Sequence, residues 1–102
     1  MERKFKIKAI DIEKNLLDAL KEQGYISIVN SNEDYTLMGI PSEEPSDLVE
    51  RLKKLGKVII IPKGVLSGQT MDYITKTKDI YLNRAFGISR MLLDLKLIFL
   101  FG

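Results

Sequence analysis

The spacing of apolar and polar residues changes its period within the first part of the chain. Charged and apolar side chains alternate over KFKIKAI (4–10), which predicts a half-buried strand. Over 12–20 an apolar residue recurs at every fourth position, which predicts an amphipathic helix. Asp11 is suited to cap the start of that helix, and Gly24 is suited to the left-handed position just after its end.

The same kinds of element then follow a second time. Strands are predicted at 25–29 and 35–40, with a turn at 30–34 between them. A second helix, with Ser42 as its predicted cap and leucines at every third or fourth position, leads into a further strand at 57–62.

The two halves of this region match each other when the chain is shifted by 32 residues. Ancestral duplication and the general likeness of helix–glycine–strand segments explain the match equally well. Both explanations give the order β-α-β-β-α-β over residues 4–62. That order is typical of an α+β, ferredoxin-like core, a four-stranded antiparallel sheet with both helices on one face. The identical pairs are Leu16/Leu48, Leu20/Leu52, Lys21/Lys53, Gly24/Gly56 and Ile28/Ile60.

The helices of such a core cover one sheet face, so the other face needs a separate cover. The residues on that face are predicted to be largely apolar. A large exposed apolar face usually marks a contact surface. The cover would come either from residues 63–102 or from a second copy of the chain. The predicted apolar residues of this face include Val29, Met38, Ile40, Ile59 and Ile61.

Residues 63–102 are predicted to form an α/β extension of the same single domain. Ser67 is suited to cap a short helix, and 79–83 is predicted to be a strand. The apolar end of the chain, MLLDLKLIFLFG (91–102), is also predicted to be a strand, because Asp94 and Lys96 would then share one side. Such a strand is expected to be covered, either by the sheet of its own chain or by another chain.

Composition restricts the chemistry more than it identifies it. The chain has 102 residues, a net charge of +2 and ordinary globular proportions of 45% hydrophobic and 29% charged residues. It contains no cysteine and no histidine, which excludes disulfides, thiolate nucleophiles, imidazole ligands and histidine-based triads. We therefore expect that the protein binds no metal and no cofactor and is not an enzyme. The start of the chain lacks the apolar core of a signal peptide, and the apolar end is shorter than the roughly 20 residues of a membrane span. A location inside the cell is expected.

Two segments resemble known binding motifs but lack residues that those motifs require. The segment KGVLSGQT (63–70) has the strand–loop–helix order of a phosphate-binding loop, but Gly64 and Gly68 are one residue too close and Gln69 replaces the lysine. The order of elements is also that of an RNA-binding module, yet YTLMGI (35–40) lacks the base-stacking aromatics. A phosphate or nucleotide site at 63–70 and nucleic-acid binding by lysines both stay open as alternatives.

One local resemblance concerns IYLNRAFGISRML (80–92). It resembles the opening strand and turn of a family of small archaeal-virus proteins that degrade cyclic oligoadenylate messengers, where the run is close to YLANAFS followed by ML. Here Asn83 and Arg84 depart from that run, and the family's catalytic histidine cannot be present, so the resemblance implies no activity or site residue. As a whole the sequence is similar to the orphan proteins of viruses that infect hyperthermophilic archaea.

Together these patterns predict a non-enzymatic protein–protein interaction module that binds a protein or peptide, with a homodimer as the expected form. The predicted partner-binding residues are Val29, Met38, Ile59, Ile61, Ile98, Phe99, Leu100 and Phe101. The alternative is a nucleic-acid-binding accessory protein that uses Lys4, Lys6, Lys8, Lys57 and Lys63.

Overall fold

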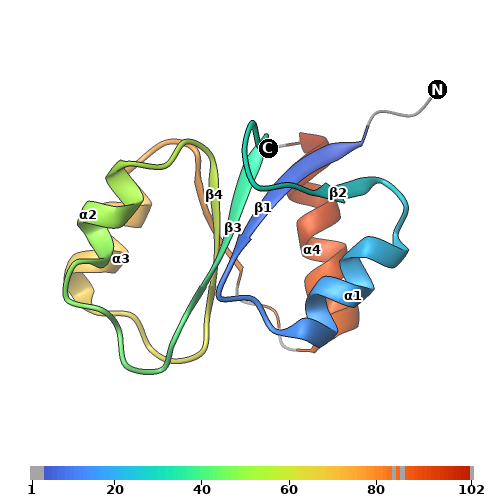
Figure 1. The fold of residues 1–102 in the computed structure, drawn as a ribbon. Helices are drawn as coiled ribbons and strands as arrows, with labels where there is room; N and C mark the ends of the chain where they lie inside the picture. The colour runs from blue at the N-terminus through green and yellow to red at the C-terminus, as the bar shows by residue number, and fades with distance from the viewer. Residues whose placement is uncertain (1–3, 84, 86, 102) are drawn as a thin grey trace.

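The computed structural model describes residues 4–83, 85 and 87–101 of the chain. Strands and helices alternate along it, apart from one place where two strands follow each other directly (Figure 1). The elements are β1 (Phe5–Ile10), α1 (Lys14–Glu22), β2 (Ile26–Ile28), β3 (Tyr35–Ile40), α2 (Leu48–Lys53), β4 (Val58–Pro62), α3 (Gly68–Lys76), β5 (Ile80–Leu82) and α4 (Ile88–Phe101).

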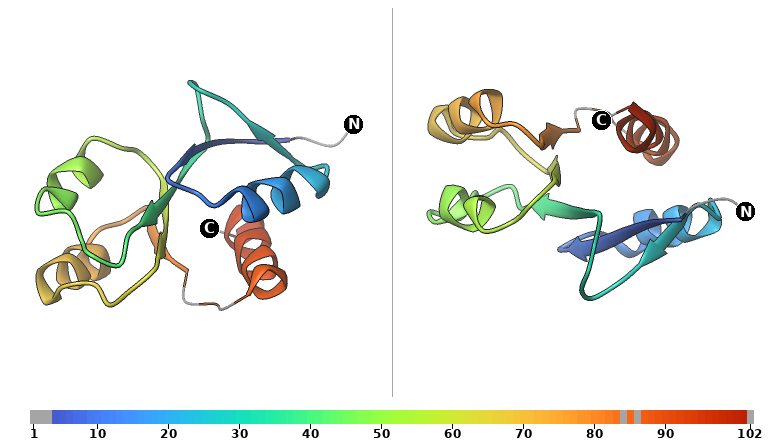
Figure 2. Two further views of the ribbon diagram at one scale, coloured as in Figure 1. Left: turned by 60° about the horizontal axis from the view of Figure 1, so that its bottom comes forward. Right: turned by 90° about the horizontal axis from the view of Figure 1, so that it is seen from above.

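The five strands form one parallel sheet in the order β2-β1-β3-β4-β5. Helices α1 and α4 cover one face of this sheet, and α2 and α3 cover the other (Figure 2). This is the strand order of the doubly wound, flavodoxin-like arrangement. The predicted ferredoxin-like core, with its antiparallel sheet and helices on one face, is therefore wrong.

The predicted turn at 30–34 is instead a crossing from one side of β1 to the other. The Val29 amide donates to the Ile7 carbonyl beside β2, and the Asp34 amide donates to the Lys6 carbonyl on the side where β3 pairs. A parallel connection normally needs about a dozen residues or more. Here a shorter connection suffices, because the chain does not return to the start of β1. Strand β2 pairs with the first half of β1, and β3 pairs with the second half.

Both faces of the central strands are buried within the chain itself. All six residues of β3 are buried, as are Val58–Ile61 of β4. Such continuous burial is typical of parallel strands with helices on both faces. The predicted apolar face is therefore not open, and residues 63–102 supply part of its cover through α3 and α4. Met38, Ile59 and Ile61 lie in the core, and Val29 is half-buried at the start of the crossing segment.

The apolar end of the chain forms helix α4, so the predicted terminal strand is wrong. Leu95 and Phe99, one turn apart, are buried against the sheet. The Phe99 ring centroid lies 5.3 Å from that of Phe5 and 5.2 Å from that of Tyr35. The strand prediction assumed that a helix would have to bury Asp94 or Lys96. In the helix these two flank the buried side, and the side facing away from the core is apolar as well.

The helix boundaries confirm some of the predicted caps and contradict others. Ser67 caps α3 as predicted, accepting a hydrogen bond from the Thr70 amide, and Gly24 has the predicted positive φ of 79°. Asp11 does not cap α1, whose N-cap residue is Glu13, and α2 begins several residues after Ser42. Within the described part of the chain, no helix is long and apolar enough to cross a membrane.

Candidate functional site: the outer side of α4 and the carboxyl-edge pocket

Helix α4 carries apolar side chains on the side that faces away from the sheet. Leu93, Leu97 and Leu100, which we call the outer stripe, are 50%, 48% and 57% exposed. Their spacing of four and three residues places them along one side of the helix. Phe101 extends the apolar surface beside the stripe and is 81% exposed. A soluble amphipathic helix would carry polar residues here.

Charged residues border the outer stripe on its two flanks. By helical geometry Asp94 lies on one flank and Lys96 on the other, about 160° apart around the helix axis when measured across the stripe. The Lys96 ammonium lies 6.0 Å from the centroid of the Tyr25 ring, which holds that flank against the β2 end of the molecule. Arg90, exposed and seven residues before Leu97, continues the line of the stripe toward the start of α4. The stripe is therefore a short apolar seam with Asp94 and Lys96 on its flanks and Arg90 at one end.

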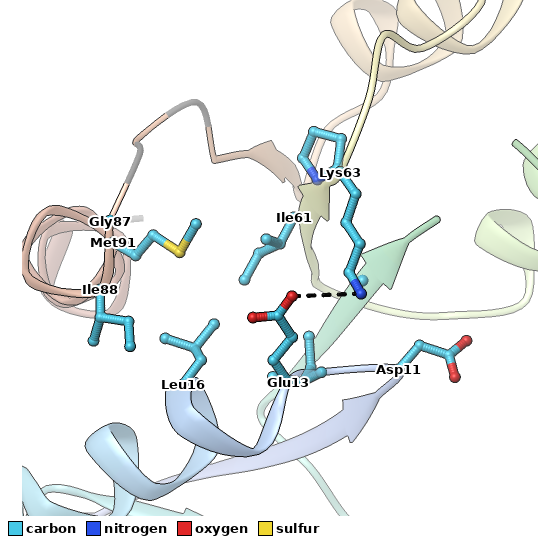
Figure 3. A pocket seen from close by; sticks show the side chains of 11 residues that line it. Asp11, Glu13, Leu16, Ile61, Lys63, Gly87, Ile88 and Met91 are labelled. Carbon is cyan, nitrogen blue, oxygen red and sulfur yellow. Dashed lines mark ion pairs between the residues drawn. The ribbon is translucent and has the colours of Figure 1, made fainter. Parts of the chain in front are cut away.

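A pocket of about 430 Å³ lies at the carboxyl edge of the sheet, on the side of α1 and α4. Its lining comes from the β1–α1 turn, the end of β3, the end of β4 and the start of α4 (Figure 3). In doubly wound sheets this edge is the usual place for a ligand, where the connections of neighbouring strands diverge to opposite sides. We call this cavity the carboxyl-edge pocket.

A close backbone contact shapes one wall of that pocket. Asp11 has a positive φ of 54°, which turns the chain sharply between β1 and α1. The turn brings the Asp11 carbonyl so close to Gly39 that a β-carbon on Gly39 would collide with it. Only glycine fits at this point of β3.

The mouth of the pocket is spanned by an ion pair between two elements. The Lys63 ammonium, just after β4, lies 3.5 Å from a Glu13 carboxylate oxygen at the start of α1 (Figure 3). Both side chains are largely exposed, at 51% and 69%. Below them the floor is apolar, with Leu16 from α1, Ile61 from β4 and Met91 from α4.

The loop that resembles a phosphate-binding loop is closed by the chain's own carboxylate. Glu44 accepts hydrogen bonds from the Ser67 amide, the Ser67 hydroxyl and the hydroxyl of Thr70, which is buried at the start of α3. The Thr70 hydrogen bond lowers the pKa of Glu44, with a further lowering from Ser67 and a partial opposition from burial. Because a negative group already lies at the N-terminus of α3, this position does not favour a phosphate.

The five lysines of the nucleic-acid alternative do not gather in one patch. A row along β1, on the side opposite Phe5 and Ile7, contains Lys4, Lys6 and Lys8. Lys57 precedes β4 and lies 5.4 Å from the centroid of the Tyr35 ring, while Lys63 belongs to the carboxyl-edge pocket.

Of the predicted interface residues in the tail, Leu100 and Phe101 are exposed, Ile98 is half-buried and Phe99 is in the core. Sequence reasoning missed the outer stripe, because the predicted strand puts Leu93, Leu95 and Leu97 together on the side opposite Asp94 and Lys96. The spacing of Leu93, Leu97 and Leu100 by four and then three residues was the available signal for a helix.

Comparisons with protein families, with curated proteins and with solved structures give no match. The described residues also contain no cluster of three or more side chains that would hold a metal ion. The outer stripe and the carboxyl-edge pocket are the two candidate sites of the described residues.

Proposed function

We propose that the protein is a non-enzymatic interaction module that forms a homodimer through the outer stripe of α4. The observation that carries the proposal is the half-exposure of three leucines in register on a helix whose opposite side is already buried. A second apolar stripe on the outer side of a helix normally marks a contact surface.

The outer stripe suits pairing with another helix rather than contact with a broad surface. Apolar residues spaced alternately by four and three positions form the narrow seam of a two-helix coiled coil. The buried contacts of Leu95 and Phe99 hold α4 in place before any partner arrives. Preorganisation of this kind lowers the entropic cost of association.

The charges at the flanks favour a parallel arrangement of two copies, in which Arg90 lies beside its own copy at the exposed end of the seam. When two identical helices pair in parallel about a twofold axis, opposite flanks of the seam face each other. The Asp94 flank of one copy then lies beside the Lys96 flank of the other. An antiparallel pair would bring like flanks together, which is unfavourable.

Nucleic-acid binding is less well supported. Three of the lysines, Lys4, Lys6 and Lys8, form a short row along β1. The other two lie at opposite ends of β4, with Lys57 before the strand and Lys63 after it. A nucleic-acid footprint needs basic residues clustered on one face. Binding of labelled RNA or DNA that weakens steeply with salt would favour this alternative.

Disulfide trapping tests the proposed pairing, because the chain has no cysteine of its own. Single variants Leu93→Cys and Leu100→Cys are each oxidised at low protein concentration. A parallel pair brings each position close to its own copy, within the roughly 4.4–6.8 Å between α-carbons that a disulfide spans. Both variants should therefore form covalent dimers.

Lys76→Cys on α3 is the matched control, since it is exposed and lies on the other side of the sheet. It should form little covalent dimer under the same conditions, because α3 lies outside the proposed interface. Trapping of all three variants to the same extent would argue against a specific interface. Trapping of neither α4 position would argue against the parallel pair, because an antiparallel pair centred on Leu97 places Leu93 beside the partner's Leu100.

A further inference from the structure

The carboxyl-edge pocket combines an apolar floor with two opposite charges at its mouth. Its floor is built by three separate elements through Leu16, Ile61 and Met91, and its volume of about 430 Å³ falls within the range of small-molecule sites. Its position at the carboxyl ends of the strands is where doubly wound sheets bind ligands.

The ion pair across the mouth is the kind that a ligand can replace. Glu13 and Lys63 are largely exposed, and exposed pairs hold their side chains together only weakly. Each of them can exchange its partner for a ligand group of the opposite charge. Asp11 also lines the pocket, but its carboxylate points away from the cavity, so we assign it no contact (Figure 3).

We propose that the carboxyl-edge pocket binds a small zwitterion with an apolar body, of which an aliphatic α-amino acid is the simplest form. The ligand's carboxylate pairs with Lys63 and its ammonium group with Glu13. Its aliphatic part packs on Leu16, Ile61 and Met91. One exposed ion pair is thereby replaced by two, while apolar surface of ligand and floor leaves water.

A ligand with only one charged group would fit less well. A simple carboxylate would leave Glu13 without its lysine, and a simple amine would leave Lys63 without its glutamate. A zwitterion gives both Glu13 and Lys63 a partner of opposite charge. Length of the aliphatic part matters independently, since each buried methylene group contributes about a fourfold gain in affinity.

Isothermal titration of the full chain with leucine tests the assignment. The probes for comparison are 4-methylpentanoate, which lacks the ammonium group, 3-methylbutylamine, which lacks the carboxylate, and alanine, which lacks most of the apolar body. We expect saturable binding of leucine and affinities at least tenfold lower for the other three. Absence of saturable leucine binding overturns the proposal, as does equal binding of either single-charge analogue.

Variants of the two walls supply the second arm of the test. Lys63→Gln and Glu13→Gln should each weaken leucine binding about tenfold, because each removes one charged contact. Lys76→Gln is the matched control, since it removes one partner of another exposed ion pair, with Asp72 on α3, at 3.1 Å. Unchanged affinity in both wall variants, or equal weakening in the control, contradicts the proposed site.

Methyl NMR locates the ligand independently of the variants. The Met91 methyl group lines the pocket, whereas Met71 belongs to α3 on the other face of the sheet. Leucine should shift the Met91 signal and leave the Met71 signal unchanged, and the reverse pattern would overturn the assignment. Leu97 does not line the pocket, so leucine binding should survive Leu97→Glu, which disrupts the proposed homodimer.

Discussion

At the carboxyl edge of the sheet, one backbone contact decides how the chain can turn. The Asp11 carbonyl packs against Gly39, where no β-carbon has room. Nothing in the spacing of apolar residues indicates this contact, because it joins two segments far apart in the sequence. The glycine is therefore a requirement of the tertiary structure and not of strand β3 itself.

Gly39→Ala should consequently destabilise the protein by about 2 kcal/mol or more, since the new methyl group forces the β1–α1 turn away from β3. Gly56→Ala is the control, because a β-carbon there would meet no atom within 4 Å. The control should be neutral or slightly stabilising. Urea unfolding measures both changes, and similar free energies for the two variants would contradict the described contact.

Glu44 provides a second test at the residue scale. Glu44→Gln removes the negative charge that accepts hydrogen bonds from Ser67 and Thr70 at the start of α3. We expect a loss of about 1 kcal/mol in the free energy of unfolding near neutral pH. Glu43→Gln, at the exposed neighbouring position, is the control and should change little.

The pH dependence of this difference has a definite sign. The pKa of Glu44 is lowered in the folded protein relative to its ordinary value of 4.5, so its contribution is present above that value. It disappears as the pH falls through the lowered pKa. Unfolding curves of wild type and Glu44→Gln should therefore differ at pH 7 and converge as the pH falls below 4.5 and through the lowered pKa. A difference that grows on acidification would contradict the assigned hydrogen bonds.

Among the elements, α4 has two different roles on its two sides. Leu95 is fully buried and Phe99 nearly so, while Leu97 is half-exposed. Leu95→Ala should cost about 2–5 kcal/mol in unfolding free energy, because it leaves a cavity under the helix. Leu97→Ala, measured at a concentration low enough to keep the chain monomeric, should cost less than about 0.5 kcal/mol. Equal costs would mean that α4 packs with a different side toward the sheet.

The order of the elements up to residue 83 could be predicted from the sequence, because apolar spacing, cap residues and glycines mark where each element lies. The pairing of the strands could not. Segment 29–34 is compatible with a hairpin turn and with a crossing over β1, and only the offset register of β2 and β3 decides between them. The continuous apolar run of β4 was the available signal for a parallel, doubly covered sheet.

The end of the chain shows a related limit of sequence patterns. The rule that apolar residues belong on one buried side favours a strand over 91–102, since Asp94 and Lys96 then share a side. It fails because α4 is apolar on both its inner and its outer side. The surplus of apolar residues that misled the strand prediction is the outer stripe itself.

In the whole molecule, the two candidate surfaces lie on the same side of the sheet and use different parts of α4. The start of α4 helps to line the carboxyl-edge pocket, and its outer side carries the stripe. The sequence could suggest a contact surface at the end of the chain, but not the pocket. Its lining comes from four separate segments that only the parallel topology brings together.

The most direct test of the proposed interface is the mass of the protein in solution, measured by light scattering over a range of concentrations. Wild type should have twice the 11.7 kDa mass of one chain, and Leu97→Glu should have the mass of a single folded chain. The glutamate places two like charges within the seam, which opposes pairing and leaves the monomer intact. A wild-type protein that stays at 11.7 kDa up to its highest soluble concentration would contradict the homodimer.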